Sequence, residues 1–161
     1  MTGYPLGPVF DFLQRLWALN HALEKVSSDM EKCLGVTAQQ RLIIRCVGRY
    51  PGMTAGQLAS LLHVDPGTVS ASLKRLETKE LLERRKDPRD RRRVFLGLTA
   101  GGRQLDRPEP VSVEAAVEKL LATTGAEDLE VVTALLGGLT QLLHAEKAPG
   151  ASKARKPPVS P

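Results

Sequence analysis

The residues from Thr54 to Thr99 constrain the fold of this chain more than any other part of the sequence. Thr54 is suited to cap a short helix that ends near His63, and Asp65 is suited to cap the next, with Pro66 at the first helical position. Each helix carries apolar residues at helical spacing, namely Leu58, Leu61 and Leu62 in the first and Val69, Leu73 and Leu76 in the second. The segment therefore begins with two short helices separated by a tight turn.

A β-hairpin with a very basic tip is predicted directly after the second helix. The expected strands are Leu81–Lys86 and Arg93–Leu98, and the turn-rich residues 87–92 between them have a length typical of a hairpin loop. From Arg84 to Arg93 there are seven basic residues and two acids, so this segment carries 7 − 2 = +5, as much as the whole chain. Charge so concentrated favours an anionic partner, and we expect the phosphate backbone of double-stranded DNA.

The second helix of the pair has a polar face opposite its apolar one. This face is small and polar near the helix N-terminus and cationic further on. It consists of Pro66, Gly67, Thr68, Ser70, Ala71, Lys74 and Arg75. The free N–H groups of a helix N-terminus attract phosphate, while Ser70, Ala71 and Lys74 are placed to face base edges and backbone. We therefore predict that this face enters the major groove.

Upstream of this segment the sequence predicts two further helices. The first runs from Pro8 to Met30, with apolar residues mostly three or four apart, and Gly35 is well placed as its left-handed stop. The second begins at Thr37, which forms a capping box with Gln40. The first helix is longer than a small core needs, so part of its face is expected to meet a second subunit.

Downstream, Thr99 caps a helix that Pro108 and Pro110 must interrupt, because neither proline fits inside a regular helix. Ser112 can cap a new helix, and a strongly apolar last helix is expected from about Glu127 to His144. Residues 146–161 are rich in Lys, Arg and Pro and have little to bury, so they are predicted to form a disordered basic tail. That tail either adds nonspecific attraction to phosphate or is simply solvated.

Composition limits the alternatives. The 161 residues are 42% hydrophobic but only 4% aromatic, so we expect one folding unit, mainly α with a small β-hairpin, whose core is built from aliphatic side chains. No apolar run approaches the roughly 20 residues that span a bilayer, and no secretory signal is present, so a cytoplasmic protein without a membrane partner is expected. Nucleophile motifs, phosphate-binding Gly loops and clustered carboxylates are missing, so we expect no enzyme, no cofactor and no metal.

Several phrases closely resemble the MarR family of bacterial transcription regulators. They are Thr-Ala-Gly-Gln-Leu-Ala at 54–59, Val-Asp-Pro-Gly-Thr-Val-Ser at 64–70, Leu-Lys-Arg-Leu-Glu at 73–77, Leu-Leu-Glu-Arg at 81–84 and Asp-Pro-Arg-Asp-Arg-Arg-Arg-Val-Phe-Leu-Gly-Leu-Thr at 87–99. The resemblance is strong from Thr37 to Leu105 and extends to both ends by helix layout.

The resemblance implies a homodimer. Residues 1–145 would form the regulator, with a winged helix-turn-helix lobe at 36–106 and a helical dimerisation region made of 8–34 and 111–145. It implies sequence-specific binding to a pseudo-palindromic operator, more often as repressor than activator, and in many members release by a small phenolic or other aromatic effector.

The resemblance also assigns residues. The recognition helix maps to Asp65–Lys79. The DNA-binding wing maps to Arg89, Asp90, Arg91 and Arg92, with one arginine in the minor groove, although which one stays open. Trp17 and His21 would lie beside an effector pocket, with ordinary packing at the dimer core as the alternative.

Cysteine oxidation is a second signal in the family. Cys33, near a helix end, is the candidate redox residue here, and an inert thiol is the alternative reading. Cys46 lies on an apolar helix face, where buried inert thiols are common.

Several positions depart from the family pattern. His63 and Glu80 stand where glycine is usual; His63 is expected to be a structural turn residue, whereas Glu80 suggests a displaced turn. The break at Pro108 and Pro110 falls where most members have one continuous helix.

Two other functions remain open from the sequence. A nonspecific architectural DNA-binding protein could be driven by the wing and the basic tail alone. A winged-helix protein-interaction module could present the same face to a protein partner.

Overall fold

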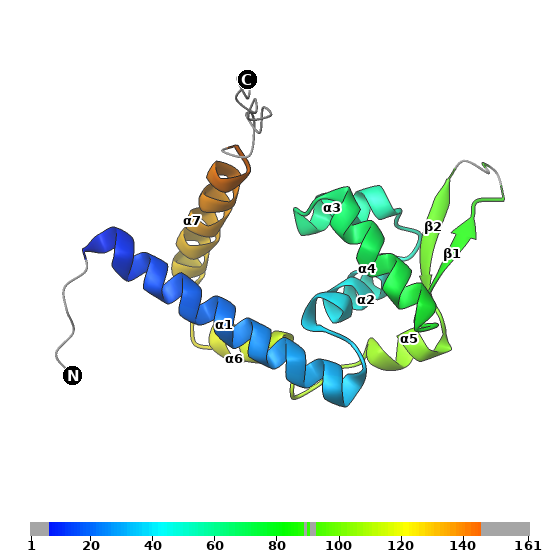
Figure 1. Ribbon diagram of the computed structural model, residues 1–161, viewed down its shortest axis with the longest axis horizontal. Coiled ribbons are helices and arrows are strands. Elements are labelled where there is room, and N and C mark those ends of the chain that lie inside the picture. The colour runs from blue at the N-terminus through cyan, green and yellow to red at the C-terminus, as the bar shows by residue number, and fades with distance from the viewer. Residues whose placement is uncertain (1–6, 89, 91–92, 146–161) are drawn as a thin grey trace, which may run out of the picture. The chain divides into compact units, whose positions relative to one another are not determined.

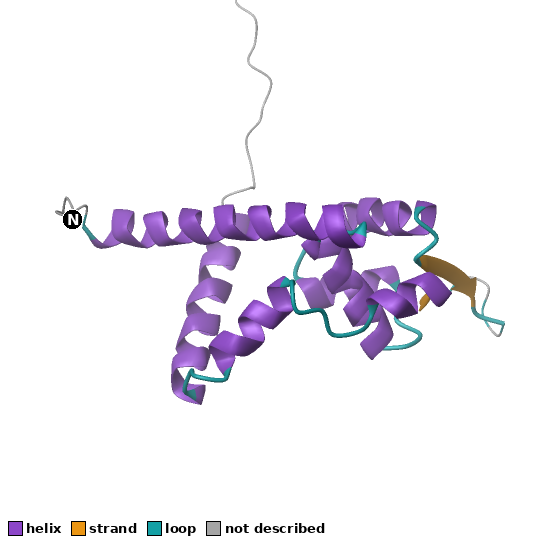
Figure 2. Ribbon diagram, turned by 90° about the horizontal axis from the view of Figure 1, so that it is seen from below, coloured by secondary structure: helices purple, strands orange, loops and turns teal. Residues whose placement is uncertain are grey.

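The computed structural model describes residues 7–88, 90 and 93–145. Its elements are α1 (Pro8–Leu34), α2 (Ala38–Arg49), α3 (Ala55–Leu62), α4 (Pro66–Thr78), β1 (Leu82–Lys86), β2 (Val94–Leu98), α5 (Ala100–Leu105), α6 (Val113–Leu121) and α7 (Ala126–Ala145) (Figure 1). The two strands, orange in Figure 2, form one antiparallel hairpin in a chain that is otherwise helical. The predicted fold class is confirmed. None of the helices described is both long and apolar enough to cross a membrane.

The chain divides into two compact units, and the boundary in the sequence falls between Val117 and Glu118. The first unit contains the helix-turn-helix, the hairpin and a shared aliphatic core. That core is made of Val36, Ile43, Ile44, Val47, Met53, Leu58, Ala59, Val69, Leu73, Leu76, Leu82, Leu96 and Leu98. It contains no aromatic side chain, as the low aromatic content predicts, so the lobe is held together by burial of branched aliphatic groups.

Side chains cap most helix starts as predicted. Thr37 and Gln40 form the expected capping box at α2, and Thr54 forms a second one with Gln57 at α3. The Thr99 hydroxyl accepts a hydrogen bond from the Gly102 N–H at 3.1 Å, and the Ser112 hydroxyl accepts one from the Ala115 N–H at 3.2 Å. The starts of α2, α3, α5 and α6 are therefore encoded locally.

Among the described residues, two that are not glycine have left-handed backbones. His63 ends α3 with φ 51°, as expected of a structural turn residue. Glu80 has φ 55°, so the turn before β1 is not displaced, contrary to the suggestion from sequence. Its carbonyl accepts a hydrogen bond from the Thr99 hydroxyl at 2.6 Å, and this contact from the far end of the hairpin helps to hold the strained residue.

The hairpin is one residue shorter at the start of each strand than predicted. Leu82 pairs with Leu98, and Arg84 pairs with Leu96. Strand β2, the inner strand of the hairpin, is also bonded to the turn before α3, because the Leu96 N–H donates to the Met53 carbonyl at 2.8 Å. The wing is therefore fixed to the helix-turn-helix along one edge.

The predicted break after α5 is confirmed. That helix ends at Leu105, and α6 does not begin until Val113, with Pro108 and Pro110 between them. At the other end of the unit, α1 extends to Leu34, beyond the apolar pattern that ends at Met30, and stops as predicted at Gly35, whose φ of 73° is the expected left-handed cap. Met30, in the last part of α1, is fully buried.

The second unit holds the end of α6 and the whole of α7. The 20 residues of α7 run from Ala126 to Ala145, close to the predicted span, and none of them is buried. Most of its apolar side chains, among them Leu135 and Leu142, are exposed. The predicted basic tail, 146–161, lies outside the described residues.

Candidate nucleic-acid interface

Asp65 precedes α4 as predicted, but its side chain does not cap the helix. Asp65 occupies the N-cap position with φ −59° and ψ 139°, yet its side chain makes no capping hydrogen bond. Pro66 is in the first turn, where its missing N–H is harmless. The first-turn N–H groups are therefore not taken up by Asp65 and can bind an external anion such as phosphate.

The outward face of α4 is where the sequence predicts it. Val69, Leu73 and Leu76 are in the core, joined by Ser72, which is also buried. The seven residues of the predicted reading face are all exposed: Pro66, Gly67, Thr68, Ser70, Ala71, Lys74 and Arg75. The face thus combines small polar groups at the helix start with two cations further on, an arrangement able to approach base edges closely and to bind phosphate.

The hairpin next to α4 uses part of its positive charge internally. Arg84 Nε lies 2.7 Å from Glu77 Oε1 of α4, and Arg85 Nε donates to Glu83 Oε1 at 3.0 Å. The Arg93 guanidinium stacks over Phe95, with 5.5 Å between its central carbon and the ring centroid. The sequence pattern groups these cations with the wing, and it does not predict that Glu77, Glu83 and Phe95 interact with them.

The hairpin turn is partly described. The Asp87 N–H donates to the Arg93 carbonyl at 3.0 Å, and the Arg93 N–H donates to the Asp90 carbonyl at 2.9 Å. Asp90 is exposed, and Arg93 directly precedes β2. The other predicted wing residues, Arg89, Arg91 and Arg92, lie outside the described residues, so their assignment to DNA stays a prediction.

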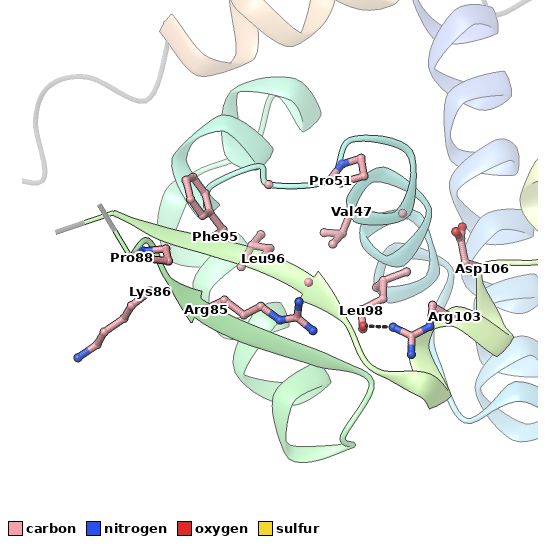
Figure 3. A pocket seen from close by; sticks show the side chains of 13 residues that line it. Val47, Pro51, Arg85, Lys86, Pro88, Phe95, Leu96, Leu98, Arg103 and Asp106 are labelled. Carbon is pink, nitrogen blue, oxygen red and sulfur yellow. Dashed lines mark hydrogen bonds between the residues drawn. The ribbon is translucent and has the colours of Figure 1, made fainter. Parts of the chain in front are cut away.

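The predicted effector residues lie on the exposed surface of α1. Trp17 is 67% exposed and His21 is also exposed, both on α1. The cavity drawn in Figure 3 lies elsewhere, between the end of α2, the hairpin and α5, with a volume of about 570 Å³. Val47, Phe95 and Arg103 are among its lining residues, and Arg103 Nη1 donates to the Leu98 carbonyl at 2.8 Å. An effector site at Trp17 and His21 stays a prediction.

The two thiols differ in environment. Cys33 is exposed, whereas Cys46 is half-buried against the core of the first unit. Burial raises the pKa of the Cys46 thiol, which disfavours the reactive thiolate, in line with the inert role expected for it. Within residues 7–88, 90 and 93–145, no three His, Cys, Asp or Glu side chains are grouped to hold a metal ion.

Comparisons with known proteins agree with this geometry. Residues 36–94 match the MarR family. The chain is similar to the organic hydroperoxide resistance transcriptional regulator of Bacillus subtilis (strain 168), with 27% identity over 80% of this chain and 86% of that protein.

Solved structures share the fold. Streptococcus pneumoniae FabT, solved in complex with DNA, is 29% identical, with a TM-score of 0.60 over 86% of this chain and 97% of FabT. The PcaV transcriptional regulator from Streptomyces coelicolor, solved with its natural ligand, has a TM-score of 0.65 at 21% identity over 89% of this chain and 99% of PcaV. With the helix-turn-helix, the basic hairpin and the matched residues 36–94 together, the chain is similar to the winged-helix transcription regulators of the MarR family.

Proposed function

We propose that this protein is a cytoplasmic, homodimeric repressor that reads a pseudo-palindromic operator with α4 in the major groove and the wing in the adjacent minor groove. The observation that carries the proposal is the exposed face of α4, on which all seven predicted residues lie outside the core. The DNA complex of FabT supports it. Dimer symmetry would place two α4 helices about one helical turn of DNA apart, roughly 34 Å.

Exposed apolar side chains support the dimer. On α1, Val9 is 67% exposed and Phe10 is 62% exposed. On α7, Leu135 and Leu142 are 58% and 66% exposed. Large apolar groups gathered on helices in this way are typical of surfaces that bury one another between subunits. Sedimentation of the purified protein at several concentrations should give the mass of two chains.

A small aromatic effector completes the proposal. PcaV, which shares the fold, was solved with its natural ligand, and this supports binding of a small ligand here. Trp17 and His21 are the residues proposed to contact the effector, and Cys33 is the alternative sensor through oxidation. Ligand release predicts that an active phenolic compound weakens DNA binding by wild-type protein and has less effect on a Trp17→Ala variant.

The deciding experiment is selection of bound sequences from random DNA with the full-length protein, repeated with phenolic compounds present. Enrichment of an inverted repeat is the expected result. Equal affinity for selected and random duplexes at two salt concentrations would instead indicate a nonspecific architectural protein. DNA retention that does not change when Arg91 and Arg92 are replaced by alanine would indicate a protein-interaction module.

A further inference from the structure

Arg41 is a charged residue inside the first unit. It lies on α2 and is only 2% exposed. Its Nη1 donates to the Leu105 carbonyl at 2.6 Å, and its Nη2 donates to the Arg107 carbonyl at 2.6 Å. Its Nε lies 3.0 Å from Oε1 of Glu114, in the first turn of α6. One guanidinium therefore holds the end of α5, the connector after it and the start of α6.

A second arginine on the same face of α2 holds the connector too. Arg45 Nη1 lies 2.9 Å from Asp106 Oδ1 and also donates to the Asp106 carbonyl. Gly48, three residues further on, leaves room for this contact, because a Cβ there would collide with the Asp106 carboxylate. Arg41, Arg45 and Gly48 have the spacing i, i+4, i+7, so they lie along one side of the helix.

The arrangement has a physical reason. A buried guanidinium is tolerated only when it is paired and hydrogen-bonded. Here its acceptors are carbonyls that have no helical partner, because Leu105 ends α5 and the prolines at 108 and 110 prevent the helix from continuing. The rigid planar fork of arginine holds several acceptors in one geometry, which the point charge of lysine does not. The interrupted connector is thus held in one conformation.

The other exit from the lobe is held at the start of the same helix. The Ala38 N–H donates to the Ser27 hydroxyl of α1 at 3.0 Å, and Lys79 Nζ donates to the Gly35 carbonyl at 2.7 Å. The connection toward α6 is therefore fixed to α2, and the connection toward α1 is fixed to α2 through Ser27 and to the end of α4 through Lys79. In a dimer held together by helices outside the lobe, these connections determine the distance between the two lobes.

We propose that Arg41 is a positioning residue for operator recognition: by fixing the connector to α6, it sets the spacing at which the two recognition helices of a dimer meet DNA. The inference rests on the proposed function and gives it a determinant that does not touch DNA. A residue that only stabilised the lobe would lower affinity for every operator equally. A positioning residue must also change which half-site spacing is preferred.

The test measures how tightly the full-length protein binds the inverted repeat that wild type selects. The spacer between the half-sites is left unchanged, or is lengthened or shortened by one or two base pairs. Arg41→Lys keeps the charge but loses the fork. Ile43→Ala is the matched control, because Ile43 is fully buried in the same helix and lies in the lobe core. Arg41→Lys should reduce the preference for the selected spacer by about tenfold, as expected when contact between coupled groups is lost. Ile43→Ala should weaken binding to all spacers alike.

A spacer preference unchanged in Arg41→Lys, or reduced equally in Ile43→Ala, would overturn the proposal. If Arg41→Lys does not fold, Glu114→Gln decides by the same criterion, because it keeps the shape of the partner and removes its charge. A DNA-free measurement separates this inference from operator reading. Spin labels at Ser60→Cys, in protein carrying Cys33→Ser and Cys46→Ala, report the inter-lobe distance in the dimer. The distribution of inter-lobe distances should broaden in Arg41→Lys. An unchanged width of this distribution would refute the positioning role of Arg41, even if no operator were found. If wild-type protein selected no inverted repeat, only the proposed function would be refuted.

Discussion

Arg84 Nε lies 2.7 Å from Glu77 Oε1, so the first strand of the hairpin is bonded to the last turn of α4. The two elements proposed to contact different grooves of DNA are thereby joined by a side-chain ion pair. Both side chains are partly exposed, at 39% and 30%, so solvent screens the attraction. The pair aligns the elements more than it stabilises them.

A double-mutant cycle with Glu77→Ala and Arg84→Ala should give a small coupling. We expect about 0.5 kcal/mol in the free energy of unfolding, because the pair is partly exposed. Urea denaturation of the four proteins measures it. A coupling above about 2 kcal/mol would mean that the pair behaves as a buried one.

Lys74→Ala should weaken operator binding with little change in sequence preference. Loss of one phosphate contact is expected to reduce the slope of log affinity against log salt by about one. Lys25→Ala removes the same charge from an exposed position on α1 and serves as the control. Equal salt slopes for the two variants would show that Lys74 does not contact the phosphate backbone.

Gly102→Ala should destabilise the first unit strongly. A Cβ at Gly102 would overlap the backbone carbonyl of Leu81, which cannot move without disturbing β1. We expect a loss of about 3 kcal/mol from overpacking, measured by urea denaturation. At Gly101 the nearest atom to an added Cβ is Leu81 Cδ2, at an ordinary 3.4 Å, so Gly101→Ala should be close to neutral. Similar losses at both positions would contradict this explanation.

His63→Gly should stabilise the protein. His63 has φ 51°, and a left-handed backbone costs an L-residue about 1–2 kcal/mol, a cost that glycine does not have. Glycine loses more conformational entropy on folding, which offsets only part of this gain. The free energy of unfolding should rise by about 0.5–1 kcal/mol. Ser60→Gly, inside the same helix, should lower it by about 0.5 kcal/mol, so a fall in both variants would exclude strain at His63.

Cys46 should react with iodoacetamide more slowly than Cys33 at neutral pH. Burial raises its pKa, so its thiolate fraction is smaller, and its rate should climb as pH increases toward the raised pKa. Mass spectrometry of peptides from timed reactions measures both rates, with unfolded protein as the control in which they converge. Slow reaction of both thiols in the folded protein would remove Cys33 as a redox sensor.

The sequence predicts the local features of this protein well, because their causes lie within a few residues. The Thr37–Gln40 capping box, the left-handed stop at Gly35 and the inward face of α4 follow from spacing alone. Local signals also overstated two features. Asp65 begins α4 without a side-chain cap, and Glu80 adopts the conformation usually left to glycine, because Thr99 holds it from across the hairpin.

Contacts distant in sequence were not predictable in this way. Arg41 looks like the polar face of an amphipathic helix, yet it is buried because its acceptors arrive from residues 64 and 66 positions away. The partner of Arg84 was missed for a related reason: a run of cations indicates a DNA-binding surface, whereas Glu77, which neutralises one of them, is brought to Arg84 by the packing of α4 against the hairpin.

Strand β1 is the outer edge of a two-stranded sheet, because the inner strand is bonded to the Met53 carbonyl. An edge strand can pair with the same strand of another molecule and so begin aggregation. Here Arg84, Arg85 and Lys86 are exposed along that edge, and repulsion between like charges opposes such pairing. The basic character of the hairpin thus also protects the free protein in solution, and substitutions that neutralise these three residues to weaken DNA binding would at the same time make the protein prone to self-association.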